Sequence, residues 1–307
     1  MRSKIAALAG IGLIAAALTG CATASADSAP GSSSEAVTAT GEFGTAPEVE
    51  FPTPLMSSRT ECSVLIEGDG EPITGTQYVQ GAVTFLNGAT GQVIQAAGYD
   101  DAPVELPLGQ FPPGVADGIS CGSEGGRVAI VIPPDEGYGP QGMQLGLDTE
   151  DRLVLVVDIV QAFPPRADGA VQLSKDGFPA VVLAPDGRPG ITVPKKDAPE
   201  EFDSEVLKAG DGETVQDGDR VVVHYTGVLW DDNTVFDSSW EDGAPVAFQV
   251  GENGEVVPGF SKAIVGQQVG SQVVAIIPPE DGYGDQVAGS IPAGSTLVFV
   301  IDILGIA

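Results

Sequence analysis

This 307-residue chain has few side chains that could take part in a reaction, and one tyrosine-containing turn sequence occurs twice in it. PPDEGYG (133–139) and PPEDGYG (278–284) each follow a run of β-branched apolar residues, so each tyrosine comes where a strand gives way to a turn. His224 is the single histidine, and the cysteines show no metal-ligand spacing. No nucleophilic constellation is present. These residues favour a function that needs no covalent catalysis, no metal and no cofactor.

The two tyrosine turns belong to an internal repeat. A shift of 142 positions places the GDG at 68–70 on the GDG at 210–212, and after the shift grows to 145 the two GYG turns coincide. The repeat predicts two homologous domains, at 58–163 and 178–307. The Pro-rich and Gly-rich stretch between them predicts a linker over 164–177.

Short apolar runs separated by Gly, Asp and Pro predict the strands that would position these groups. In the second domain these runs are VVVHYTGVLW (221–230), VAFQV (246–250), VVAII (273–277) and LVFVIDIL (297–304). PGFSKAIVGQQVG (258–270) differs, because it begins with proline, has apolar residues near helical spacing and contains glycines that could end a helix. Each domain is therefore expected to be an α+β module, with one short helix against a curved antiparallel sheet.

The first residues of the chain predict export. Arg2 and Lys4 give a basic start, and Ile5–Leu18 is an apolar stretch too short for a typical membrane span but suited to the core of a signal peptide. It runs into the tetrapeptide LTGC, which ends at Cys21 and resembles a bacterial lipobox. We expect a signal peptide over 1–21 and a lipid anchor on Cys21, at the cell membrane and facing outside the cytoplasm. An ordinary signal peptide with an incidental cysteine is the alternative.

The residues after the anchor predict a tether and a cross-link. Positions 22–57 are rich in small polar residues without periodicity, which is typical of a flexible tether. With Cys21 lipidated, Cys62 and Cys121 are left over, and a disulfide between them is the simplest state outside the cytoplasm. Two free thiols are the alternative.

The net charge argues against nucleic acid as a partner. It is −30, from 43 acidic and 13 basic residues, and such a surface repels phosphate backbones. The acidic residues are spread along the chain, which suits the solubility of an exported protein better than a dedicated acidic site. The membrane is expected to be contacted through the lipid anchor only.

Five motifs in the second domain resemble the FKBP-type peptidyl-prolyl cis–trans isomerase family, in family order and with family-like spacing. They are VVVHYTG (221–227), VFDSS (235–239), VVPGF (256–260), GYG (282–284) and IPAGSTLVFVIDIL (291–304). The resemblance covers essentially the whole second domain. It implies a curved antiparallel sheet wrapped around one short helix, with an apolar pocket between the two.

The resemblance also assigns residues to that pocket. It implies catalytic roles for Tyr225, Asp237 and Tyr283, and substrate-binding roles for Phe236, Val246, Phe248, Val256, Val257, Phe260, Ile291 and Phe299. The hydroxyl of Tyr283 and the amide of Val257 would hold substrate carbonyls. Many family members carry tryptophan at the position of Phe260 and an aromatic residue at that of Val246, so the pocket shape is expected to differ here. Without the resemblance, the apolar positions would read as ordinary core. His224 alternates with Tyr225 and is expected to face away from the pocket.

The implied reaction fits the scarcity of reactive groups. Rotation of an X-Pro bond crosses a barrier of about 18–20 kcal/mol because resonance makes the C–N bond partly double. The twisted transition state has lost much of the amide dipole, so a water-poor apolar pocket favours it over the planar ground state. We expect an isomerase that assists the folding of exported proteins, with proline-containing peptides and unfolded exported proteins as ligands and rapamycin-type macrolides as competitors. The alternatives are a non-catalytic chaperone or proline-peptide binding module, and a structural partner of envelope proteins.

The first domain loses these residues one by one. The positions of Tyr225, Phe236, Asp237, Phe260 and Phe299 become Val83, Ile94, Gln95, Val115 and Leu155. Tyr138 alone survives, opposite Tyr283. The first domain is therefore expected to keep the fold without the activity.

Overall fold

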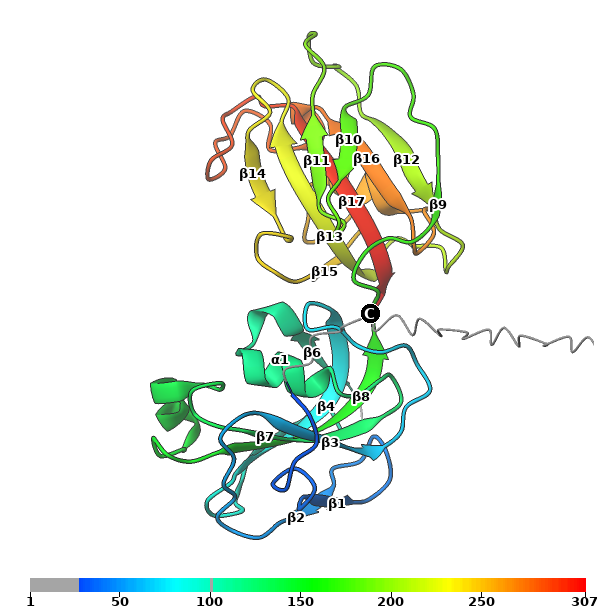
Figure 1. The fold of residues 1–307 in the computed structure, drawn as a ribbon. Helices are drawn as coiled ribbons and strands as arrows, with labels where there is room; N and C mark the ends of the chain where they lie inside the picture. Colours follow the sequence, from blue (N-terminus) through cyan, green and yellow to red (C-terminus); the bar gives the residue numbers. More distant parts are fainter. Residues whose placement is uncertain (1–27, 100–101) are drawn as a thin grey trace, which may run out of the picture.

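The computed structural model describes residues 28–99 and 102–307. Two domains follow one another along the chain, and the C-terminus lies close to where they meet (Figure 1). Each domain holds one large antiparallel sheet, a separate two-stranded antiparallel pair and one short α-helix, which confirms the predicted α+β architecture of two tandem domains. No helix in these described ranges is long and apolar enough to cross a membrane. The predicted signal peptide, with Cys21 at its end, lies outside the described residues.

The first domain is built on a six-stranded sheet in the order β3-β7-β8-β4-β5, with β6 also paired to β4. Its strands are β3 (Glu61–Ile66), β4 (Tyr78–Asn87), β5 (Val93–Ala97), β6 (Val104–Pro107), β7 (Arg127–Ile132) and β8 (Leu153–Ala162). Its helices are α1 (Pro113–Ile119) and the 3₁₀ turns η1 (Leu108–Gln110) and η2 (Gly139–Leu145). At the centre of the sheet Phe85 of β4 lies opposite Leu155 of β8.

The second domain repeats this plan in a seven-stranded sheet, in the order β14-β13-β17-β16-β12-β9, with β15 also paired to β13. Its strands are β9 (Ala170–Val171), β12 (Asp203–Ala209), β13 (Arg220–Leu229), β14 (Val235–Ser238), β15 (Val246–Gln249), β16 (Gln272–Ile277) and β17 (Leu297–Ile306). Its helices are α2 (Pro258–Ile264) and the 3₁₀ turn η3 (Pro279–Asp281). Gly227 of β13 lies opposite Phe299 of β17, which is the register of Phe85 and Leu155 in the first domain.

Strand alternation separates an inner from an outer layer of core in each domain. In β13, Val223 and Tyr225 face the inner side, where they pack in one cluster with Phe260 and Ile264 of α2. Proline at the first position of α2 suits a helix start, and Gly266 with φ +87° follows its end. The helix therefore lies against the concave face of the sheet, as the sequence predicts.

The outer faces of both sheets are also covered. Every residue of β7 and β16 is buried, so neither strand has a side open to solvent. In the second domain the cover is a hairpin of β10 (Ala180–Leu183) and β11 (Pro189–Thr192), whose Ile191 packs on this face. In the first domain it is the segment that carries β1 (Thr38–Thr40) and β2 (Glu48–Glu50).

The prediction of a flexible tether over 22–57 is therefore wrong from residue 28 onward. Val37 and Leu55 are buried against the outer face of the first sheet. The fully buried Arg127 forms an ion pair with Asp158 and donates hydrogen bonds to backbone carbonyls of the covering segment, including that of Gly41 at 3.0 Å. The polar composition of the segment hides this role, because its few apolar residues and its backbone make the contacts.

The predicted linker over 164–177 is likewise partly wrong. Ala167 is buried and its amide donates to the carboxylate of Asp302 at 2.8 Å, and β9 adds to the edge of the second sheet. Just before this stretch, Phe163 is buried with Tyr78 of the first domain and Leu304 of the second. The linker is short because the chain packs on the second domain from Ala167 onward.

Cys62 and Cys121 form a disulfide, as the sequence predicts. The bond joins β3 to the residues that follow α1, with the two Cα atoms 6.5 Å apart. It therefore cross-links the first domain alone.

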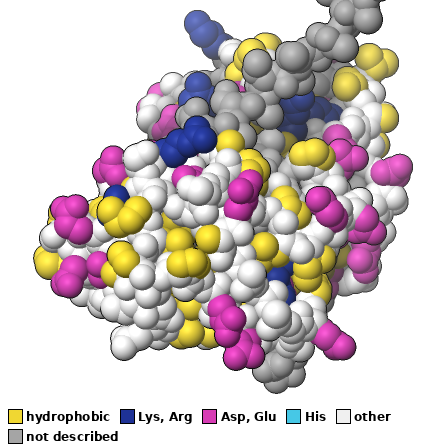
Figure 2. Space-filling model, turned by 60° about the horizontal axis from the view of Figure 1, so that its bottom comes forward, with side chains coloured by type: hydrophobic (Ala, Val, Ile, Leu, Met, Phe, Trp, Pro, Cys, Tyr) yellow, Lys and Arg dark blue, Asp and Glu magenta, His cyan; other side chains and the backbone are white. Residues whose placement is uncertain are grey.

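Acidic side chains are spread over the surface. Figure 2 shows them scattered across the face that carries the first domain, among neutral and apolar groups, without gathering into one patch. This distribution agrees with a general contribution to solubility.

Candidate active site

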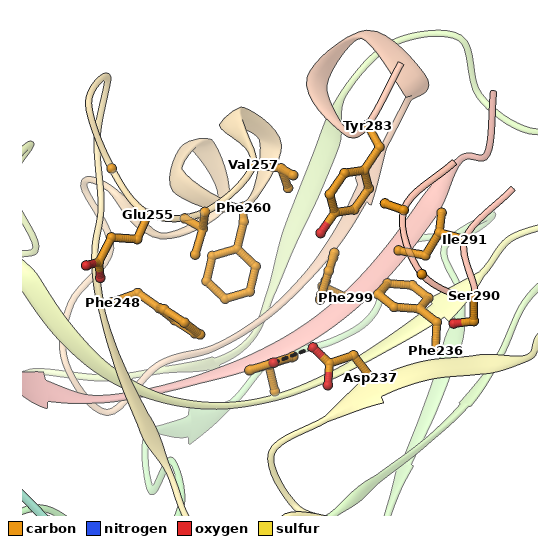
Figure 3. Close-up of a pocket in the computed structure, with 15 residues that line it drawn as sticks. Phe236, Asp237, Phe248, Glu255, Val257, Phe260, Tyr283, Ser290, Ile291 and Phe299 are labelled. Atoms are coloured by element: carbon orange, nitrogen blue, oxygen red, sulfur yellow. Dashed lines mark hydrogen bonds between the residues drawn. The ribbon is translucent and has the colours of Figure 1, made fainter. Parts of the chain in front are cut away.

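A cavity of about 750 Å³ opens in the second domain between α2, the sheet and the loop that follows β16 (Figure 3). The side chains around it are mainly aromatic and aliphatic, with one carboxylate at the wall and one at the rim. The lining residues are Tyr225, Phe236, Asp237, Phe248, Gly254, Glu255, Val256, Val257, Phe260, Tyr283, Ala288, Gly289, Ser290, Ile291 and Phe299.

Aromatic rings packed edge to face form the bottom of the cavity. Phe260, at the start of α2, is buried, and its ring centroid lies 5.3 Å from that of Phe299 and 5.8 Å from that of Tyr225. Phe236 reaches Phe299 from β14, with centroids 5.4 Å apart. Edge-to-face contacts fix the angles between rings. The floor is therefore apolar, rigid and closed to water from below.

One polar pair is embedded in this aromatic wall. The hydroxyl of Tyr225 donates a hydrogen bond to Oδ2 of Asp237, with the oxygens 2.5 Å apart. Burial, and then the neighbouring carboxylate, raise the pKa of Tyr225 far above its ordinary value, so its hydroxyl stays protonated. The pair holds the carboxylate at the edge of the cavity.

Two further polar groups lie at the mouth of the cavity. Tyr283 is 41% exposed and points its hydroxyl toward the cavity in Figure 3. Val257 precedes α2, and its amide donates no hydrogen bond to any group within residues 28–99 and 102–307. A hydroxyl donor and an unused amide donor at one opening can both bind carbonyl oxygens of a peptide.

The structure brings all the predicted pocket residues to this one cavity except Val246, which does not line it. Val246 begins β15 and packs against the inner core, opposite Val223 of β13. Its side chain is short, while the ring of Phe248, two residues on along the same face, reaches the cavity and stands 6.1 Å from the ring of Tyr225. The roles of the remaining residues in binding and catalysis stay predictions.

Sequence reasoning missed several residues of the rim. Gly254 and Glu255 precede α2, and the tight turn at 288–291, closed by two backbone hydrogen bonds between Ala288 and Ile291, brings Ile291 over the cavity. These positions lie in loops, where neither strand nor helix periodicity gives a signal.

Gly227 is the missed residue with the largest consequence. A Cβ atom at this position of β13 would lie 2.5 Å from Cζ of Phe236 and 2.8 Å from Cε1 of Phe299. The glycine therefore leaves the space that these two rings occupy. The signal was present in the sequence, since the first domain has Phe85 at the equivalent position.

His224 faces away from the cavity, as predicted. Its Nδ1 lies 2.8 Å from the hydroxyl of Ser239, and its ring stacks on that of Trp240 with centroids 3.8 Å apart. Burial lowers the pKa of His224 to about 4. The histidine is therefore neutral and structural at physiological pH.

The first domain closes the corresponding space. Val83, Val115 and Leu155 are buried in its core, and none of them lines the cavity beside Tyr138. Phe85 stands where Gly227 leaves room in the second domain, and a smaller cavity of about 460 Å³ remains beside Tyr138. The deep aromatic floor exists in the second domain alone, among the residues the structure describes.

A family model agrees with this division. The model of the FKBP-type peptidyl-prolyl cis–trans isomerases matches residues 72–160 and 211–304, which together make up more than half of the chain.

Three individual proteins each match over about one domain of this chain. The chain is 45% identical over 91 residues to FK506-binding protein 2 of Gibberella zeae, covering 30% of this chain and 46% of that protein. It is 36% identical over 121 residues to FK506-binding protein of Streptomyces anulatus, covering 39% of this chain and 97% of that protein. The crystal structure of FkpA from Escherichia coli is 32% identical, covers 43% of this chain and 53% of its own, and superposes with a TM-score of 0.32.

Proposed function

Because the chain belongs to the FKBP-type peptidyl-prolyl cis–trans isomerase family, we propose that its second domain catalyses rotation about X-Pro bonds in exported polypeptides. The observation that carries this proposal is the cavity with an aromatic floor, a protonated tyrosine and a carboxylate at its wall, and two peptide-binding donors at its mouth.

The geometry accounts for catalysis without a covalent step. A proline ring entering the cavity would rest on Phe260 and be enclosed by Phe236 and Phe299. The enclosed amide is cut off from water, which would otherwise stabilise the polar planar form. The free energy of the less polar, twisted transition state is therefore lowered relative to that of the planar ground state. No nucleophile is required, because no bond is broken.

The polar groups would orient the substrate and not react with it. The hydroxyl of Tyr283 and the amide of Val257 can each donate a hydrogen bond to a backbone carbonyl and so fix the direction of the peptide. Asp237, held by Tyr225, lines the cavity in which the rotating amide would lie. Holding the flanking residues while one bond turns lowers the entropy cost of reaching the transition state.

The site of action is proposed from the N-terminal sequence. A lipid on Cys21 would hold the protein at the cell membrane, outside the cytoplasm, where unfolded exported chains are its clients. Cys21→Ala should move the protein from the membrane fraction to the soluble fraction. Recovery of both forms in the same fraction would contradict the anchor.

Macrolides of the rapamycin type are proposed as competitors, because relatives are named for binding FK506 and the cavity has an apolar floor of suitable kind. Rapamycin should then inhibit isomerisation by the full chain. Nucleic acid is not proposed as a partner, given the net charge of −30.

The decisive experiment uses the full chain and a short X-Pro tetrapeptide. The wild type should accelerate isomerisation, and Phe236→Ala should lower kcat/KM by about tenfold or more, since it removes one wall of the cavity. Phe43→Ala, at a phenylalanine of the first domain that is 39% exposed, is the matched control and should not change kcat/KM. If the wild type gives no acceleration while a proline peptide still binds, the protein is a non-catalytic binding module.

A further inference from the structure

The first domain keeps a cavity where the isomerase pocket lies in the second. Three of its lining residues, Ile94, Gln95 and Tyr138, are equivalent to Phe236, Asp237 and Tyr283. It measures about 460 Å³ and has an apolar base of Phe85, Ile94 and Leu145. It is therefore a distinct feature of this domain and needs its own explanation.

This cavity cannot take the deep position of a proline ring. Phe85 occupies the place of Gly227, so the path toward the core is filled by its ring. Val115, at the position of the floor residue Phe260, is 2% exposed and belongs to the core. What remains is a hollow of about 460 Å³ whose apolar base can take an apolar side chain.

The rim of the hollow is uncharged and rich in amides. Gln95, Gln141 and Gln144 line it together with Tyr138, in a protein whose net charge is −30. Primary amides offer both donors and acceptors, which is the combination a peptide backbone presents. Burial raises the pKa of Tyr138, so its hydroxyl also remains a neutral donor.

The spacing of these rim groups matches an extended chain. Gln141 and Gln144 lie on the 3₁₀ turn η2, and Tyr138 caps its N-terminus, so the three residues follow one another at intervals of three. In a 3₁₀ turn, side chains three apart are eclipsed and about 6 Å apart along the axis. Groups on the same side of an extended peptide recur at about 6.6 Å. The spacing of the side chains of Tyr138, Gln141 and Gln144 is therefore close to the spacing of backbone groups along one side of an extended peptide.

We propose that this hollow binds an extended, uncharged polypeptide segment without requiring proline. One apolar side chain of the segment fills the base formed by Phe85, Ile94 and Leu145, and its backbone groups pair with Tyr138, Gln141 and Gln144. The first domain then holds a client chain while the second acts on an X-Pro bond elsewhere in it. In the view of Figure 1, η2 and the loop at 284–296 both project to the left side of the molecule.

Two sites on one chain would raise the affinity for long clients. Once one segment is bound, a second segment is held at a high effective concentration near the other site. A tetrapeptide, which can fill only one site, gains nothing. This consequence rests on the proposed isomerase function, whereas the binding of a proline-free segment does not.

The test measures binding of a fluorescent proline-free peptide of leucine, serine and glycine to the full chain by anisotropy. The double variant Gln141→Ala/Gln144→Ala should weaken binding by about tenfold or more, since two hydrogen-bonding side chains are lost. Met143→Ala is the matched control: Met143 lies on the same turn, is 61% exposed and does not line the hollow, so binding should persist.

A second pair of variants keeps the test independent of η2. Ile94→Asp places a charge in the apolar base and should abolish binding, while Val93→Asp, at a neighbour on β5 that is 60% exposed, should not. The proposal is overturned if no peptide binds, if the controls weaken binding equally, or if binding is lost on Phe236→Asp instead, which would place the peptide in the second domain. Binding of a neutral oligosaccharide in place of the peptide would also overturn it.

The two-site consequence has its own readout. For an unfolded protein whose refolding is limited by X-Pro isomerisation, Gln141→Ala/Gln144→Ala should raise KM relative to the KM for a tetrapeptide. An unchanged ratio would show that the two sites do not share a client. Absence of tetrapeptide activity in the wild type would instead refute the isomerase proposal and leave the peptide-binding result standing.

Discussion

Replacing Gly227 by alanine tests whether the isomerase pocket depends on this one missing side chain. The new Cβ would lie 2.5 Å and 2.7 Å from two atoms of the Phe236 ring and 2.8 Å from Cε1 of Phe299. Carbon atoms in favourable contact are about 3.5–4.0 Å apart, so the rings must retreat by roughly 1 Å. The retreat would move the walls that enclose the proline ring.

The size of the effect follows from the cost of overpacking, about 1–3 kcal/mol. Phe236 is only partly buried and can swing toward solvent, so most of this cost should fall on substrate enclosure and little on folding. At about 1.4 kcal/mol per factor of ten, kcat/KM should fall roughly 10- to 100-fold. The thermal midpoint should change by a few degrees at most.

The assay compares kcat/KM on an X-Pro tetrapeptide with thermal unfolding of the same full-length samples. Gly190→Ala is the matched control, because this strand glycine of β11 would place its Cβ 3.4 Å from the nearest atom and belongs to the hairpin that covers the outer face of the sheet, on the side away from the pocket. Full activity of Gly227→Ala at unchanged stability would refute the argument. An equal loss in Gly190→Ala would show a general effect of the substitution.

Three further predictions concern single interactions. Tyr225→Phe removes the hydroxyl that donates to Asp237 and should lower kcat/KM by roughly tenfold. Tyr99→Phe, which removes a hydroxyl bonded to Thr84 in the first domain, is the control and should leave kcat/KM unchanged. Equal activity of the two variants would argue against a role for the Tyr225–Asp237 pair. Because burial lowers the folded-state pKa of His224 from 6.5 to about 4, the unfolded chain binds the proton more readily, and this contribution to stability, present above pH 6.5, should be lost as pH falls toward 4. Denaturant titrations at pH 7 and pH 4.5 should show wild type losing up to about 3 kcal/mol more than His224→Gln, and parallel losses would disprove a depressed pKa. Cys62→Ser/Cys121→Ser opens a loop with a sequence separation of 59 and should destabilise the first domain by about 4 kcal/mol while tetrapeptide isomerisation persists; an unchanged unfolding transition would contradict this.

The sequence by itself determined the repeat, the strands, the short helix and most of the pocket. Runs such as 273–277 and 297–304 are apolar enough to be strands in any context, and the proline and glycines around 258–266 bound a helix locally. The motifs of the second domain identified Tyr225, Asp237 and Phe260, which the structure brings to one cavity. For Tyr225, strand alternation fixes the face of the sheet from which the side chain projects.

Only the tertiary structure decided what covers the outer faces of the sheets. After their first residues, Arg127 and Gln272, the strands β7 and β16 are apolar, and every residue of both is buried. They therefore require cover on both sides, but their sequences do not say which segment supplies it. The cover comes from residues 28–57 and from the hairpin after the first domain, whose contacts with the sheets join residues distant in sequence. For this reason the polar composition of residues 28–57 wrongly indicated a flexible tether.

The tertiary structure likewise decided the fine shape of the site. Val246 and Phe248 share one face of β15, and only packing shows that the longer ring reaches the cavity. Gly227 leaves space for the rings of Phe236 and Phe299, which come from two other strands. Phe85 fills the equivalent space in the first domain. Local patterns fix which way a side chain points, whereas the space in front of it depends on neighbours that only the fold brings together.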